Sequence, residues 1–212
     1  MNMKRVVVSL LLVCSMIYAK AQKIEELFIK MPDDMIVQLE EAWRKDIVDL
    51  YKSGKTATLD NTMDGKSTLQ KLTDDYMLLQ STEKSTIELK LLPLVNNTYI
   101  ICAIETVFAP VADSRFSFYS TEWQKLSSAG LLVPVTESHF LKNDIDRTSV
   151  EFLDVTSRLD MFLVKYSLSA ENRNLMAEYM TPQYVDEEYK ERLKPYLKAD
   201  PLIYEWKSGR FE

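Results

Sequence analysis

Residues 86–123 constrain the fold of this chain most strongly, because they predict three consecutive β-strands. Residues 87–91 alternate between apolar and polar side chains, which is the period of a half-buried strand. After the turn-forming pair Asn96-Asn97, residues 98–108 are almost continuously apolar, which indicates a strand buried on both faces. Residues 115–120 alternate again. A long antiparallel hairpin followed by a third strand, a meander, is therefore expected at the centre of the core.

Helices are expected on both sides of these strands in the sequence. A helix is predicted over Asp33–Ser53, because a proline and aspartates stand at its start and apolar side chains follow at helical spacing. A helical turn is expected over residues 121–129. Ser169 is interpreted as the cap of a helix over residues 170–180, and Asp186 as the start of another.

Short apolar or alternating segments elsewhere predict further strands, at residues 69–72, 76–82, 151–155, 161–168 and 202–206. The resulting fold class is α+β, with one domain over residues 22–212. We expect an antiparallel sheet of about five to seven strands, covered on one face by the N-terminal helix and by C-terminal helices.

Residues 1–21 have the pattern of a secretory signal peptide. Basic residues precede an apolar run from Val6 to Ile17, and Ala19-Lys20-Ala21 is a cleavage site of small residues, so cleavage is expected between Ala21 and Gln22. The apolar run is shorter than the roughly 20 residues that span a bilayer. Lipid attachment at Cys14 is the alternative, but the preceding residue is a valine where a small residue is expected.

Charge and composition exclude several classes of partner. The net charge is −6, and removal of the basic signal peptide makes the chain still more acidic. An acidic chain without a basic block disfavours nucleic acid and anionic membrane surfaces as partners. The chain after residue 21 contains no second apolar segment of transmembrane length, so no transmembrane span is expected there.

The sequence offers few residues for common catalytic or metal sites. His139 is the single histidine, and Cys102 is the single cysteine after the signal peptide. Zinc-binding, dinucleotide-binding and phosphate-binding motifs are absent, so no catalytic residue, metal or cofactor is assigned. Residues 60–65 resemble the start of a calcium loop, but Lys71 stands where the bidentate glutamate should be, so we interpret them as a turn. A converging pair of carboxylates remains open, because such pairing depends on tertiary structure.

One polar and aromatic group is the candidate ligand-binding site. Asp113 and Ser114 precede Tyr119 and Trp123, and the four residues suit a cleft at the end of the sheet, where aromatic rings stack on a sugar or peptide. The alternative is that Asp113-Ser114 forms a turn and that the aromatic rings belong to the core.

Several short motifs are shared with a known family: Met31-Pro32-Asp33, Leu91-Leu92-Pro93-Leu94, Thr106-Val107-Phe108-Ala109-Pro110, Asp113-Ser114, Phe118-Tyr119 and Trp123. On these motifs the chain resembles, over nearly all of residues 22–212, a family of secreted Bacteroidales proteins catalogued as a domain of unknown function. The resemblance implies the envelope of a Gram-negative bacterium, in the periplasm or beyond it, and implies no activity.

The leading hypothesis is a non-catalytic envelope protein that binds a protein or a small-molecule ligand. The second is a hydrolase that uses a carboxylate pair on glycan or peptide. The third is a structural partner in an envelope complex, which would present a large flat apolar surface.

Overall fold

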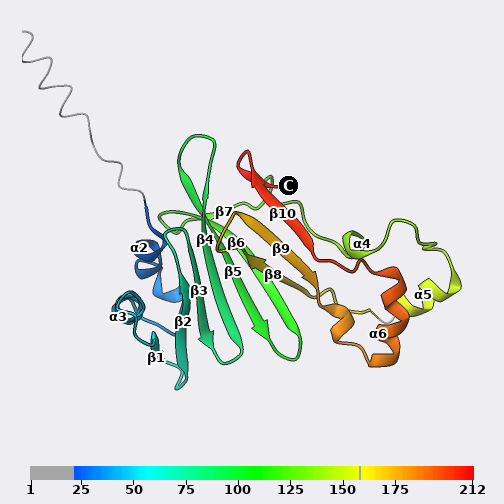
Figure 1. The fold of residues 1–212 in the computed structure, drawn as a ribbon, viewed down its shortest axis with the longest axis horizontal. Helices are drawn as coiled ribbons and strands as arrows, with labels where there is room; N and C mark the ends of the chain where they lie inside the picture. Colours follow the sequence, from blue (N-terminus) through cyan, green and yellow to red (C-terminus); the bar gives the residue numbers. More distant parts are fainter. Residues whose placement is uncertain (1–21, 158) are drawn as a thin grey trace, which may run out of the picture.

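The computed structural model describes residues 22–157 and 159–212. The predicted signal peptide, residues 1–21, lies outside the described residues and stays a prediction. Within the described residues, seven strands form one antiparallel sheet and four form a second (Figure 1). The predicted α+β class and the large antiparallel sheet are therefore confirmed.

In the large sheet each strand pairs with the next along the chain, as in a meander. Its strands are β1 Thr58–Asp60, β2 Lys66–Leu72, β3 Tyr76–Thr82, β4 Ser85–Pro93, β5 Tyr99–Phe108, β6 Ala112–Ser120 and β7 Lys125–Leu126. The second sheet runs in the order β11 Arg210–Phe211, β10 Leu202–Lys207, β9 Asn174–Tyr179 and β8 Val164–Leu168.

The expected three-strand core lies at the centre of the large sheet. Leu89 on β4 pairs with Ala103 on β5, and Cys102 pairs with Phe118 on β6. Asn97 adopts a φ of 62° in the β4–β5 turn, a conformation that asparagine tolerates better than most residues. The strand β5 is buried on both faces over most of its length, as its continuous apolar run predicted.

N-terminal helices cover one face of the large sheet. Helix α2 (Ile24–Ile29) packs on β3 and β4, and α3 (Glu41–Lys52) packs on β1 and β2. The predicted helix over Asp33–Ser53 is wrong in its first third, because a 3₁₀ turn (Asp33–Met35) and an irregular segment precede α3. Its predicted end near Ser53 is confirmed.

Arg44 accounts for the late start of α3. Its side chain is only 1% exposed. Its guanidinium donates to the carbonyl oxygens of Ile29 (3.1 Å) and Leu39 (2.5 Å), to that of Met31, and to Asp33 Oδ1 (2.8 Å). These acceptors all belong to the chain before α3, so this segment wraps around the guanidinium instead of continuing the helix.

The second sheet covers the opposite face of the large sheet, for which the sequence predicted no cover. Strand β8 packs on β4, β5 and β6, and the two sheets share one hydrophobic cluster. The predicted helix over residues 170–180 is wrong, because residues 174–179 form β9 and pair with both β8 and β10. Ser169 Oγ does accept backbone N–H groups, from Glu171 at 3.2 Å and Asn172 at 3.1 Å, but it closes the β8–β9 turn.

Two further segments form a different type of secondary structure from the one predicted. The predicted strand over residues 151–155 is helix α5 (Val150–Thr156), whose first turn is capped by Ser149 Oγ. The predicted helical turn over residues 121–129 instead contains β7, because Lys125 and Leu126 pair with the end of β6. Helix α6 (Glu187–Leu193) is confirmed, with Asp186 as its cap.

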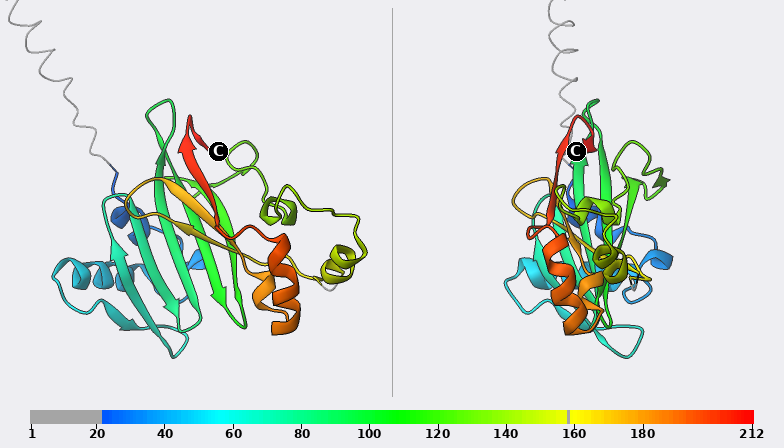
Figure 2. Two further views of the ribbon diagram at one scale, coloured as in Figure 1. Left: turned by 45° about the vertical axis from the view of Figure 1, so that its right-hand side comes forward. Right: turned by 90° about the vertical axis from the view of Figure 1, so that its right-hand side faces the viewer.

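The helices after β7 gather beyond the edge of the large sheet. Helix α4 (Glu137–Phe140), α5 and α6 lie together at one end of the molecule (Figure 2). The C-terminal chain then returns as β10 to complete the second sheet (Figure 1). Within the described residues, no helix has both the length and the apolar character that crossing a bilayer requires.

Candidate functional site

Asp113 and Ser114 lie at the start of β6 and bond to the second sheet. Ser114 Oγ accepts the backbone N–H of Tyr166 at 3.0 Å, and Asp113 Oδ1 accepts that of Val164 at 3.2 Å. In the described part of the chain β8 is an edge strand, whose outward N–H groups have no strand to bond. The two side chains supply acceptors in place of that strand. They belong to β6, paired with β5, and so do not form the turn that the sequence suggested.

Tyr119 and Trp123 lie on the other face of the large sheet. Their ring centroids are 5.6 Å apart, and Trp123 Nε1 donates to the carbonyl oxygen of Leu27 in α2 at 3.0 Å. Ser114 and Tyr119 lie an odd number of positions apart on one strand, so their side chains point to opposite faces. Asp113 and Ser114 bond to the second sheet, whereas Trp123 bonds to α2, so the structure keeps the two pairs of predicted site residues apart.

Trp123 nevertheless borders a hollow. The hollow has a volume of about 340 Å³ and lies between α2 and residues 121–123. A ligand role for Asp113, Ser114, Tyr119 and Trp123 stays a prediction.

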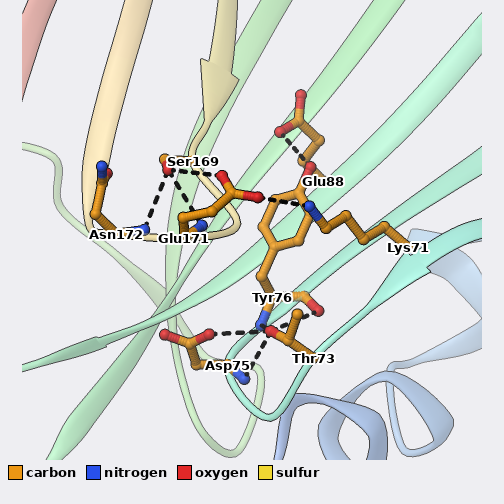
Figure 3. A network of polar contacts seen from close by, with 8 residues as sticks. All are labelled: Lys71, Thr73, Asp75, Tyr76, Glu88, Ser169, Glu171 and Asn172. Atoms are coloured by element: carbon orange, nitrogen blue, oxygen red, sulfur yellow. Dashed lines mark hydrogen bonds and ion pairs between the residues drawn. The ribbon is translucent and has the colours of Figure 1, made fainter.

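A buried polar network lies between the sheets, where the sequence pattern suggested the exposed side of a strand. Glu88 is 7% exposed and Lys90 is 1% exposed. Glu88 Oε2 accepts the Tyr76 hydroxyl at 3.0 Å and the backbone N–H of Leu168 at 2.9 Å. Lys90 Nζ pairs with Asp75 Oδ2 at 3.0 Å. Figure 3 shows Glu88 and Tyr76 joined inside this network.

Burial shifts the pKa values of this network. Loss of water raises the pKa of Glu88 above its usual value, and this effect outweighs the hydrogen bonds from Leu168 and Tyr76 that lower it. The Tyr76 pKa is also raised, first by burial and then by the neighbouring Glu88 charge. Both polar atoms have partners within the protein, and the bond from Glu88 to Leu168 joins the two sheets.

An ion pair borders the same network. Lys71 Nζ on β2 contacts Glu171 Oε1 in the β8–β9 turn at 2.7 Å (Figure 3). The pair lowers the pKa of Glu171, chiefly through the hydrogen bond from Lys71. It ties the turn of the second sheet to the large sheet, although an exposed pair of this kind contributes little stability.

Cys102 belongs to the hydrophobic cluster between the two sheets. Its side chain is fully buried in β5, and burial raises the pKa of the thiol. A raised thiol pKa opposes formation of the reactive thiolate. Among the described residues, no group of three or more His, Cys, Asp and Glu side chains is placed to hold a metal ion.

A cleft of about 640 Å³ lies among the C-terminal elements. One wall is the end of β9 and the residues that follow it, a second wall is α6, and a third is the segment 197–201. Phe140 and Tyr179 contribute aromatic surface, and their rings stack at 5.0 Å with an angle of 12° between the ring planes. The cleft is therefore lined by an apolar centre with polar side chains around it.

Lysine side chains surround this centre. Lys142 Nζ donates to the carbonyl oxygen of Pro195, and Lys198 Nζ donates to that of His139, both at 2.7 Å. Lys190 and Lys194 also line the cleft, paired with acidic residues of α6 at 3.4 and 3.5 Å. The carboxylates that line the cleft are Glu178, Glu191 and Asp200.

Tyr179 lines the cleft, but its hydroxyl is buried. Burial raises the pKa of Tyr179 to about 12. Glu137 and Thr181 influence that pKa, but among the described residues none bonds the hydroxyl with hydrogen-bond geometry. The two groups that influence its pKa do not line the cleft, so the hydroxyl is not presented to a ligand there.

Sequence reasoning missed this cleft. Its residues come from four separate segments, around 140–142, 178–183, 190–194 and 197–201. No segment carries a catalytic or binding motif by itself, and one of them was assigned to the wrong type of secondary structure. The available signal was a lysine directly after a leucine in two segments, Leu141-Lys142 and Leu197-Lys198, and such pairs are common in proteins.

Comparison with known proteins identifies relatives without an assigned activity. The family model described as "Protein of unknown function (DUF3256)" matches residues 16–211. A solved structure, that of a domain of an uncharacterized protein from Porphyromonas gingivalis W83, is similar with a TM-score of 0.81 and 28% identity. The match covers 89% of this chain and 98% of that chain. No curated protein matches.

Proposed function

The chain belongs to the DUF3256 family of proteins of unknown function, and on this premise we propose that it is a non-catalytic binding protein of the bacterial envelope. Its ligand, a small molecule or a segment of a protein, occupies the cleft between β9, α6 and residues 197–201. The cleft itself is the observation that carries the proposal. Its volume of about 640 Å³ falls in the size range of small-molecule sites, which are mostly apolar with a few polar groups.

Export to the envelope is the second part of the proposal. It rests on the signal-peptide pattern of residues 1–21 and on the similarity to a protein from a Bacteroidales organism. Expression of the full chain in a Bacteroidales host, followed by fractionation and N-terminal sequencing, tests it. We expect a product that begins at Gln22 in the periplasmic or extracellular fraction. A cytoplasmic product that retains residues 1–21 would contradict export.

Ligand binding is tested by thermal shift on residues 22–212. The panel contains glycans, peptidoglycan fragments, peptides and small apolar acids, and a ligand that binds only the native state raises the melting temperature. Ala199 lines the cleft and is exposed, so Ala199→Trp fills the cleft without entering the core. Ala129→Trp, in an exposed turn outside the cleft lining, is the matched control. We expect a shift that Ala199→Trp abolishes and the control retains.

A hydrolase acting on glycan or peptide is the second candidate, favoured by the carboxylates in the same cleft. Glu178 is paired with Lys165 at 3.1 Å, whereas Asp200 forms no ion pair among the described residues. Incubation of the protein with glycan and peptide substrates separates the two functions. Product formation that Glu178→Gln or Asp200→Asn removes would support the hydrolase. Binding without product supports the binding protein.

A further inference from the structure

We propose that the cleft binds a small anionic amphiphile, a molecule with an apolar body and a single carboxylate. This inference rests on the proposed function and specifies the chemistry of the ligand. The apolar body would lie against the aromatic wall, and the carboxylate would accept from Lys142 or Lys198. Three features of the cleft carry the proposal: its apolar centre, the arrangement of these two lysines, and the balance of charge around it.

The apolar centre is formed by side chains that are largely held in place by the protein. Phe140 and Met180 are buried, and Tyr179 stacks on Phe140. Phe162 packs against both rings, at 6.2 Å from Phe140 and 5.7 Å from Tyr179. A rigid aromatic wall of this kind favours apolar ligands, because it gains burial without losing much side-chain freedom.

Lys142 and Lys198 are brought together by a short antiparallel contact. Leu141 pairs with Leu197, the Lys142 N–H donates to the Tyr196 carbonyl at 2.9 Å, and the Lys198 N–H donates to the Phe140 carbonyl at 2.8 Å. In such a pairing the two lysines are diagonal neighbours on one face, with Cα atoms about 7–8 Å apart. Their ammonium groups bond the carbonyl oxygens of Pro195 and His139, at the two opposite ends of this contact, so a carboxylate in the cleft would accept from one lysine or the other.

The ammonium groups of these two lysines keep donors for a ligand. Each donates to one main-chain carbonyl, and an ammonium has three N–H donors. Among the described residues, neither lysine forms an ion pair with a carboxylate, in contrast to Lys190 and Lys194. The two positive charges therefore have no acidic partner, although the chain as a whole is acidic.

The charge balance of the lining favours a single negative charge on the ligand. Lysines at 142, 190, 194 and 198 face carboxylates at 178, 191 and 200, which leaves one positive charge in excess. A ligand with several negative charges would meet these carboxylates as well as the lysines.

Calorimetry with matched probes on residues 22–212 tests the inference. The probes are octanoate and 3-phenylpropionate, which distinguish an aliphatic from an aromatic body, and 1-octanol and methyl octanoate, which lack the charge. We expect at least one of the acids to bind at least 10-fold more tightly than the neutral probes. We also expect its affinity to weaken as salt is raised, because exposed charges are screened.

Variants test whether Lys142 and Lys198 cause the preference for a charged ligand. Lys142→Gln with Lys198→Gln should weaken binding of the acid about 10-fold or more and leave binding of 1-octanol unchanged. The Arg variants at both positions keep the charge and should retain binding. Lys84→Gln with Lys125→Gln removes the same charge from exposed turns and strands outside the cleft lining and should have no effect. If the Gln double variant does not fold, the comparison of the acids with the neutral probes still shows whether the cleft prefers a negative charge.

The outcomes separate this inference from the proposed function. Binding of 1-octanol as tight as that of the acids, lost in Ala199→Trp, would keep the cleft as a binding site and overturn the anionic amphiphile. Acid binding unaffected by a folded Gln double variant would also overturn it. If these probes fail while another class in the thermal-shift panel binds in the cleft, the inference falls and the function stands. If no class binds, both fall.

Discussion

The carboxylate of Glu88, in the middle of the large sheet, accepts the backbone N–H of Leu168 in the second sheet at 2.9 Å. The residues are 80 positions apart in the chain. The same Oε2 atom accepts the Tyr76 hydroxyl at 3.0 Å, so one buried oxygen joins β3, β4 and β8. With Ser114 and Asp113, Glu88 supplies side-chain acceptors to alternate N–H groups along β8. The second sheet is thus joined to the first without pairing between their strands.

Removal of the Glu88 carboxylate should destabilise the fold. In Glu88→Ala the Leu168 N–H and the Tyr76 hydroxyl lose their acceptor while buried, and each unsatisfied group costs about 1–3 kcal/mol. We expect a loss of about 2–4 kcal/mol in the free energy of unfolding, measured by urea denaturation. Glu88→Gln keeps an acceptor oxygen and should lose less. Glu105→Gln, on the exposed side of β5, should change stability by less than about 0.5 kcal/mol.

The raised pKa of Glu88 predicts a pH-dependent difference between the wild type and Glu88→Gln. The folded state holds the Glu88 proton more tightly than the unfolded state, whose pKa is near 4.5. The stabilising contribution of the protonated form is therefore complete below that pH and is lost as pH rises through the folded pKa. We expect wild-type stability relative to Glu88→Gln to decrease as pH rises from 4 to 8. A constant difference across this range, measured by urea denaturation, would show that the folded pKa is not raised.

Arg44 should be among the residues most sensitive to substitution. Its guanidinium bonds three carbonyl oxygens and the Asp33 carboxylate, and its side chain is buried. Arg44→Lys keeps the charge but loses the planar set of donors, so carbonyls of the segment before α3 lose their partners. We expect a loss of about 2–4 kcal/mol in the free energy of unfolding. Lys45→Ala, next in the helix and exposed, is the control, and an equal effect of the two would refute the role of Arg44.

Ser114→Ala tests the link between β6 and β8. The Tyr166 N–H loses its acceptor, which should cost about 1–2 kcal/mol in urea denaturation. Hydrogen exchange should show faster opening at Tyr166 than in the wild type, because the remaining pairing of β8 is to β9 alone. Ser117→Ala, on the opposite face of the same strand, is the control and should leave exchange at Tyr166 unchanged.

The candidate site shows where local reasoning fails. Asp113 and Ser114 are polar residues beside aromatic ones, so a ligand role and a structural role have the same sequence signature. The structure places their oxygens on N–H groups of β8, more than 50 positions later in the chain. The cleft that we propose as the binding site could not be found from local patterns either, since its lysines are brought together only by the pairing of Leu141 with Leu197.

The sequence by itself determined the meander from β4 to β6, because side-chain alternation and turn residues such as Asn97 act over a few neighbouring positions. It also determined α6, through the cap of Asp186. Only the tertiary structure decided that residues 174–179 form a strand and that Glu88 is buried. Both depend on hydrogen-bond partners from distant segments, and a local pattern contains no information about which distant segment will supply them.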